Sequence, residues 1–203
     1  MMIIIGVSGG VASGKNFVSE CFLKFGAKIF DADAEVAKLF SDNPEFQKVI
    51  KEKFPDSILN NKINKDLIAK KIFSDEFSLD LLESIIHPII NQKIDQFIAD
   101  CKFNNISIVL LNIPLLFEKD SYKRCDIAIL IVSSINLRKD RFIVREKEKN
   151  SKISDFELLQ KFNKITLNQK SDKEKGILAD AIIYNDSDRD HIISQIKLIL
   201  QNS

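Results

Sequence analysis

Five short runs of apolar residues are spaced along the chain in the way that is typical of strands buried inside a sheet. They are residues 2–7, 27–33, 106–113, 126–132 and 180–185. Short runs rich in β-branched residues suit strands that are covered on both faces. The segments between them carry apolar residues three and four positions apart, which is the helical spacing. This alternation predicts an α/β fold, a five-stranded parallel sheet flanked by helices.

Residues 44–103 interrupt the alternation because they are helical almost throughout. KDLIAKKIF, SLDLLESII and PIINQKIDQFIADCKF each have helical spacing, with a polar break near FPDSILNNKIN. Pro88 suits the first turn of the last of these helices. We expect a single unit of 203 residues with a core formed by residues 1–43 and 104–203. Residues 44–103 then form a helical domain that covers a substrate.

A glycine-rich stretch follows the first predicted strand directly. Four of the six glycines lie in GVSGGVASGKNFV, residues 6–18. A Gly-x4-Gly-Lys spacing between a strand and a helix is typical of a loop that binds phosphate. Its backbone N–H groups surround phosphate oxygens, the helix N-terminus adds its dipole, and the lysine supplies charge for the β- and γ-phosphates. The expected nucleotide-binding residues are Gly9, Gly10, Val11, Ala12, Ser13, Gly14, Lys15 and Asn16. An ordinary glycine-rich turn beside a surface lysine is the competing interpretation.

Asn16 departs from the usual form of such a loop, which has Ser or Thr after the lysine. A hydroxyl there normally binds Mg²⁺. The amide oxygen of Asn16 is also a hard oxygen ligand, so it can reach Mg²⁺ directly or through a water. Because neither the N–H groups nor Lys15 depend on this side chain, the sequence predicts a working site with an altered metal shell.

Two aspartates, Asp31 and Asp33, follow the second predicted strand. The carboxyl ends of parallel strands face the ligand crevice of an open sheet. A carboxylate there can accept or orient the proton of an attacking hydroxyl, and Asp31 can also bind Mg²⁺ through water. Either aspartate can instead cap the helix expected near Ala34. Glu118, after the third strand, is a further metal candidate through a metal-bound water, or it pairs with a surface lysine.

Several basic side chains are candidates for substrate or phosphate contacts. His87 is one of only two histidines. On pattern alone, a lone histidine before a helix-starting proline is more often a structural residue than a ligand. Arg138, Arg141 and Arg145 form one stripe along a predicted helix. Arginine suits phosphate recognition, although a solvated helix face would carry the same stripe. The charged segment 146–176 is either a lid that closes on phosphates or an exposed helix.

Composition excludes several other classes of protein. Lys and Arg number 30 against 29 Asp and Glu, which argues against a non-specific nucleic-acid binder. The three cysteines, Cys21, Cys101 and Cys125, are widely separated and form no CxxC pair. We expect reduced thiols in a cytoplasmic protein. No apolar run has the length of a membrane span, and MMIIIGV reads as a first strand rather than as a signal peptide.

The ordered set of these motifs resembles the dephospho-coenzyme A kinase family over essentially the whole chain. The set comprises GGVASGK at 9–15, DAD at 31–33, LESIIHP at 82–88, PLLFE at 114–118, and ADAIIYN at 179–185 with Gln169 upstream. The resemblance implies a P-loop kinase with a helical substrate domain and a lid. It also implies transfer of the ATP γ-phosphoryl group, with Mg²⁺, to the ribose 3′-hydroxyl of dephospho-coenzyme A. No nucleic-acid or membrane partner is implied, and a monomer is favoured.

By this family likeness the site residues take specific roles. Asp33 would be the base that accepts or orients the hydroxyl proton, with Lys15 the other catalytic group. His87 would lie in the substrate site. Arg141 and Arg145 would bind the phosphates or adenine of ATP from the start of the lid.

Two other functions remain open from the residues. One is a P-loop kinase for a different small molecule, such as a nucleoside or a metabolite. The other is a nucleotide-binding protein without turnover, in which Asn16 marks lost catalysis. A guanine-reading N-K-x-D motif is not present in the sequence, and Asp33 with the basic stripe favours a kinase.

Overall fold

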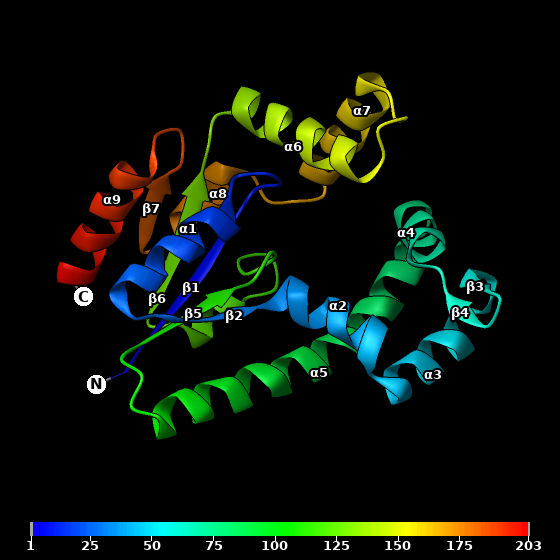
Figure 1. Cartoon of the computed structure of the whole chain (residues 1–203), viewed down its shortest axis with the longest axis horizontal. Helices are drawn as coiled ribbons and strands as arrows, with labels where there is room; N and C mark the ends of the chain where they lie inside the picture. The colour runs from blue at the N-terminus through cyan, green and yellow to red at the C-terminus, as the bar shows by residue number, and fades with distance from the viewer. Residues whose placement is uncertain (1, 203) are drawn as a thin grey trace. The chain divides into compact units, whose positions relative to one another are not determined.

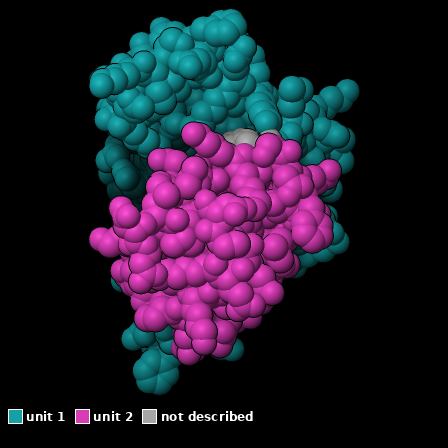
Figure 2. Space-filling view, turned by 90° about the vertical axis from the view of Figure 1, so that its right-hand side faces the viewer, with its two compact units in different colours: residues 1–30, 100–203 teal, residues 31–99 magenta. Residues whose placement is uncertain are grey.

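The computed structural model describes residues 2–202, apart from the side chain of Phe73. These residues form two compact units, distinguished by colour in Figure 2. Unit 1 contains residues 1–30 and 100–203, and unit 2 contains residues 31–99. The chain therefore leaves the first unit after its second strand and returns to it before its third central strand.

Unit 1 is built on a five-stranded sheet with the order β2-β5-β1-β6-β7. Its strands are β1 (Ile3–Gly9), β2 (Lys28–Asp31), β5 (Ile108–Asn112), β6 (Ile127–Val132) and β7 (Ala181–Tyr184). The pairings β1–β5, β1–β6 and β6–β7 are all parallel. The predicted five-stranded parallel sheet flanked by helices is confirmed, and each strand lies within its predicted segment to about two residues.

Helices cover both faces of the sheet because alternate residues of each strand are apolar on either side. One face packs against α1 (Lys15–Phe22) and α9 (Arg189–Gln201), which lie side by side in Figure 1. Val18 and Phe22 of α1 and Ile196 of α9 are fully buried there. On the other face, Leu116, Phe117 and Leu130 form a second apolar cluster against α8 (Asp172–Leu178). The carboxyl ends of β1, β5 and β6 are thereby held on a rigid support.

Residues 135–178, which include the charged segment 146–176, form a helical hairpin followed by α8. The hairpin consists of α6 (Ile135–Lys149) and α7 (Asp155–Leu167), which pack against each other. Phe142, Leu158 and Phe162 make its core, and Val11 and Ala12 of the glycine loop pack against that core. This contact fixes the glycine loop to the hairpin.

Unit 2 contains the predicted helical block. Its helices are α2 (Ala32–Asp42), α3 (Pro44–Lys53), α4 (Lys65–Ser74) and most of α5 (Glu76–Phe103). The predicted polar break holds a two-stranded antiparallel hairpin, β3 (Ile58–Leu59) and β4 (Lys62–Ile63). Asn60 and Asn61 have positive φ angles at its turn, a conformation that asparagine tolerates well.

The expectation that a helix begins at Pro88 is wrong. Pro88 lies inside α5, a continuous helix of 28 residues. The proline forfeits one hydrogen bond to the carbonyl of Ser84. Leu82 and Ile94, on either side of it, are buried, and such packing supplies most of the stability of a helix in a protein. Burial on both sides of Pro88 thus keeps one helix where local propensity favours two.

Candidate active site

The glycine loop connects β1 to α1 in the geometry that phosphate binding requires. Gly14 is the N-cap of α1 with a φ of 86°, in the left-handed region that favours glycine. Ala12 also has a positive φ of 58°. Within the loop the Ser13 N–H donates to the Gly10 carbonyl over 3.0 Å. The tight turn leads directly into the helix N-terminus, where the dipole favours an anion.

Lys15 is the first residue of α1 and bends back over the loop. Its Nζ donates to the Gly9 carbonyl at 3.4 Å, and the residue is half-buried. A positive charge is therefore held beside the N–H groups of the loop.

Asn16 is exposed, and its amide oxygen accepts a hydrogen bond of 2.9 Å from Nδ2 of Asn112. Asn112 is the last residue of β5 and is 2% exposed. Two side-chain amides thus meet where a P-loop ordinarily has a hydroxyl and an aspartate. The donor set suits Mg²⁺, which prefers oxygen ligands and keeps several of its waters. Among residues 2–202 no cluster of three or more His, Cys, Asp or Glu side chains is arranged to hold a metal.

Arg141 lies in a hydrogen-bonded network that reaches the loop. Its guanidinium donates to the Ser133 hydroxyl at 3.1 Å and to the Asn185 carbonyl at 3.0 Å. The Asn185 side chain in turn donates to the Ser13 carbonyl at 2.8 Å. Arg145 makes different contacts, because it lies over the Phe142 ring at 5.4 Å and 3.6 Å from Glu146.

Asn112 and Asn185 are site residues that the sequence analysis missed. A signal was available for both, since each ends or directly follows a predicted strand of a parallel sheet. Such positions face the ligand crevice. An asparagine there has no charge to draw attention to it, whereas Asp31 and Asp33 do.

Glu118 pairs with a lysine, but not with a surface one. Its Oε1 lies 2.8 Å from Nζ of Lys175, which is fully buried, and also accepts the backbone N–H of Lys170. Burial of a charged pair costs desolvation energy that only a close partner offsets. Glu118 therefore ties the loop after β5 to α8.

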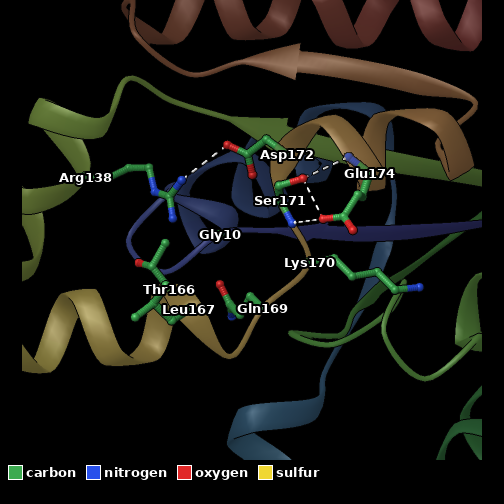
Figure 3. Close-up of a pocket in the computed structure, with 9 residues that line it drawn as sticks. All are labelled: Gly10, Arg138, Thr166, Leu167, Gln169, Lys170, Ser171, Asp172 and Glu174. Carbon is green, nitrogen blue, oxygen red and sulfur yellow. Dashed lines mark hydrogen bonds and ion pairs between the residues drawn. The ribbon is translucent and has the colours of Figure 1, made fainter.

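A cavity of about 370 Å³ opens beside the glycine loop (Figure 3). It is lined by Gly10, Arg138, Thr166, Leu167, Gln169, Lys170, Ser171, Asp172 and Glu174. Arg138 is 5% exposed and 3.2 Å from Asp172. The pKa of the Arg138 guanidinium is lowered, because the effect of burial outweighs the opposite effect of the Asp172 carboxylate. Arg138 is thus a buried structural group in the predicted arginine stripe.

Asp31, Asp33 and His87 lie in unit 2. Asp31 is the N-cap of α2, and its Oδ1 accepts the Ala34 N–H at 2.9 Å. The helix begins at Ala32, two residues before the predicted start, so Asp33 lies in its first turn and is exposed. Of the two aspartates, Asp31 makes the capping bond. His87 is also exposed on α5.

A glycine loop between the first strand of a parallel α/β sheet and its helix, followed by a lysine, defines a P-loop nucleotide-binding fold. The family model of dephospho-CoA kinase matches residues 3–191. A dephospho-CoA kinase from Bartonella quintana is 33% identical over 99% of this chain and 98% of its own length. One from Wolbachia of Brugia malayi is 30% identical over 98% and 97%. The chain belongs to the dephospho-CoA kinase family and is a kinase.

Solved structures agree with this fold. TT1252 from Thermus thermophilus matches with a TM-score of 0.80 and 26% identity, covering 99% of this chain and 97% of its own. Dephospho-CoA kinase from Campylobacter jejuni matches with a TM-score of 0.64 and 22% identity, covering 100% of this chain and 97% of its own. Shikimate kinase from Acinetobacter baumannii gives 0.57 at 15% identity, over 100% and 96%. The last two support the fold alone.

Proposed function

We propose that this chain transfers the γ-phosphoryl group of ATP to the ribose 3′-hydroxyl of dephospho-CoA, giving CoA and ADP. This would be the last step of CoA synthesis. The observation that carries the proposal is the glycine loop, with Gly14 capping α1 and Lys15 bent over the loop, in a chain of this family.

The loop and its lysine supply the electrostatic part of the mechanism. The loop N–H groups and the dipole of α1 bind the phosphates of ATP. Lys15 neutralises the charge that moves onto the bridging oxygen as the bond to the γ-phosphorus breaks. The contacts of Arg141 with Ser133 and Asn185 place a second cation in the network that supports the loop. Arg145, further along α6, is the other arginine that we assign to ATP.

Bound Mg²⁺ would supply positive charge that neutralises part of the negative charge of the ATP phosphates. Asn16 is the residue that would hold it, directly or through a water, with Asn112 orienting the amide. Asp31 and Glu118 are secondary candidates. One oxygen of Asp31 accepts the Ala34 N–H and one oxygen of Glu118 pairs with Lys175. The amide oxygen of Asn16 accepts one hydrogen bond from Asn112 and keeps a second lone pair for a metal or its water.

Asp33 would accept or orient the proton of the 3′-hydroxyl. Two features of α2 support this role of Asp33. Asp31 makes the capping bond of the helix, and Asp33 is exposed in its first turn. His87 would contact the acceptor substrate within the helical domain, residues 44–103. Residues 146–176 would act as the lid.

The cellular setting is proposed on composition. We place the enzyme in the cytoplasm, as a monomer that acts on a small molecule and not on nucleic acid. Within residues 2–202 no helix has the length and apolar character to cross a membrane.

An ADP-release assay with a panel of acceptors tests the substrate. With Mg²⁺ and ATP present, dephospho-CoA should be the efficient acceptor, and nucleosides and shikimate should give only background ADP. Efficient phosphorylation of another acceptor would favour a different small-molecule kinase. ATP binding without turnover on any acceptor would favour a binding protein.

A further inference from the structure

The backbone N–H and the backbone carbonyl of Val11 are both bonded to side chains that lie far along the chain. The Val11 N–H donates to Oε1 of Gln169 at 3.2 Å, and Nε of Arg138 donates to the Val11 carbonyl at 2.9 Å. Val11 lies at the outer end of the glycine loop. Arg138 belongs to α6, and Gln169 follows α7. The two peptide groups that flank Val11 are therefore each held by a side chain of the hairpin segment.

The surroundings of Arg138 fix its position. It is 5% exposed, bonded to Asp172 at 3.2 Å, and its guanidinium lies 5.7 Å from the Phe162 ring. A Cβ on Gly10 would approach its Nη2 to 2.2 Å. The guanidinium thus fills the space beside Gly10, with Asp172 bonded to it as Figure 3 shows.

Gln169 belongs to a short segment that is anchored at several points. Nζ of Lys170 donates to the Phe117 carbonyl at 3.2 Å, and its backbone N–H donates to Glu118. Asp172 begins α8 and holds Arg138. The segment 169–172 therefore connects the glycine loop with the loop after β5.

The loop needs such support because its own conformation is costly. Ala12 has a φ of 58°, in the left-handed region, and this conformation is unfavourable for residues other than glycine. The Ser13 N–H to Gly10 carbonyl bond closes a turn around Val11 and Ala12, and the backbone N–H and carbonyl of Val11 are bonded to Gln169 and Arg138. These bonds stabilise the one loop shape in which the N–H groups converge on phosphate.

We propose that Arg138 and Gln169 are positioning residues that hold the Val11 backbone, so that docking of residues 166–172 and binding of nucleotide phosphates favour each other. This rests on the proposed function, because it assigns regulation to the same ATP site. Linkage makes the effect reciprocal: if docking tightens nucleotide binding, nucleotide must stabilise docking by the same factor.

The test uses the full chain and ADP as the probe, with binding measured by calorimetry and amide exchange by mass spectrometry. Gln169→Leu removes the acceptor and should weaken ADP binding about 3- to 10-fold, the value of one hydrogen bond. It should also speed exchange of the 6–18 peptide. Gln169→Glu keeps an acceptor and should keep that exchange slow. Arg138→Lys should weaken ADP binding about 10-fold, because lysine keeps the charge but lacks the guanidinium that bonds the Val11 carbonyl and Asp172 together.

Matched controls lie next to each residue. Asn168→Ala and Lys139→Ala change neighbours that do not line the cavity, and both should bind ADP like the parent. In the parent, ADP should slow exchange in residues 166–172.

Three outcomes separate the claims. If the parent chain itself fails to bind ADP, the proposed function fails. If the parent binds and both Gln169→Leu and Arg138→Lys bind equally well, the positioning role is wrong. A lowered melting temperature with unchanged ADP affinity would likewise overturn it, because that is the result of a purely structural contact.

Discussion

Lys15 provides the most direct residue-level test of the glycine loop. Lys15→Ala should lower phosphoryl transfer by roughly 10²- to 10³-fold, because its charge stabilises the transition state more than the ground state. The fold should be intact, since the side chain is only half-buried and its bond to Gly9 is long, at 3.4 Å. Circular dichroism and the ADP-release assay measure the two effects. Lys24→Ala, on the exposed turn after α1, is the control, and near-parental turnover in folded Lys15→Ala would remove the loop from the mechanism.

Asn16 and Asn112 should behave as a unit. Asn16→Ala should raise the Mg²⁺ concentration needed for half-maximal rate, because it removes an oxygen ligand. Asn112→Ala should do the same by releasing the 2.9 Å bond that orients Asn16. The double variant should then raise this Mg²⁺ concentration little more than either single variant does. Asn16→Thr should keep activity or improve metal affinity. An unchanged Mg²⁺ titration in Asn16→Ala would place this side chain outside the metal shell.

Asp33 and Asp31 separate catalysis from capping. Asp33→Asn should lower turnover by about 10²- to 10⁴-fold, the usual cost of losing a general base, with little change in ATP affinity. Its effect on stability should stay within about 1 kcal/mol, the value of a charge near a helix N-terminus. Asp31→Ala should instead lower stability by about 1 kcal/mol because it removes the cap.

The control for Asp33 is Asp42→Asn, the same substitution at the other end of α2. It should turn over like the parent. Parental turnover in Asp33→Asn would refute the catalytic assignment.

The residues of the loop could be named from sequence because strand, glycine spacing and lysine all lie within one stretch. The bond between Asn112 and Asn16 and the contacts of Val11 could not be predicted, because they join residues at sequence separations of 96, 127 and 158. Only the packed sheet and hairpin bring these residues together. Arg138 shows the same limit, since its helical stripe predicts a phosphate ligand as readily as a buried contact.

At the scale of elements, α6 and α7 are joined by the carboxylate of Glu146. It accepts bonds from Lys149 at 2.8 Å and Lys161 at 2.5 Å, and its side chain is 9% exposed. Burial raises the pKa of Glu146, but the two lysines outweigh this and lower it to about 2. The ionised form of Glu146 is thus favoured in the folded protein, and its ion pairs stabilise the hairpin.

The pH dependence of stability follows from that shift. A carboxylate whose pKa is lower in the folded state stabilises the fold above its unfolded pKa, and this contribution is lost as pH falls through the folded value. Glu146→Gln should therefore lower the melting temperature at pH 7. It should also reduce the loss of stability between about pH 4.5 and pH 2. Thermal unfolding across this range measures both, with Glu148→Gln on the same helix as the control. Equal pH dependence in Glu146→Gln and the parent would contradict the pairing.

Element boundaries show where local sequence rules fail. The strands of the sheet were predictable because short apolar runs have few alternatives between helices. The continuous helix α5 was not, since Pro88 normally starts or ends a helix, and only burial of Leu82 and Ile94 reveals that it continues. The β3–β4 hairpin has two strands of two residues each, too short to leave a pattern.

At the scale of the whole molecule, the nucleotide and acceptor sites are assigned to different units. The glycine loop, Glu118 and the arginines belong to unit 1, and Asp33 and His87 belong to unit 2. Because the residues assigned to ATP lie in unit 1, we expect ATP affinity to depend mainly on that unit. Phosphoryl transfer also requires the reacting groups to come together. Turnover should depend on both units, as the contrast between Lys15 and Asp33 variants tests.

Identifying the product of the reaction is the most direct test of the proposed phosphoryl transfer to dephospho-CoA. The purified chain is incubated with Mg²⁺, ATP and dephospho-CoA, and the product is identified by mass spectrometry and phosphorus NMR. We expect one ADP for each CoA, with the new phosphate on the ribose 3′-oxygen, and loss of this product in Lys15→Ala. Release of ADP without a phosphorylated acceptor, or a phosphate at any other position, would contradict it.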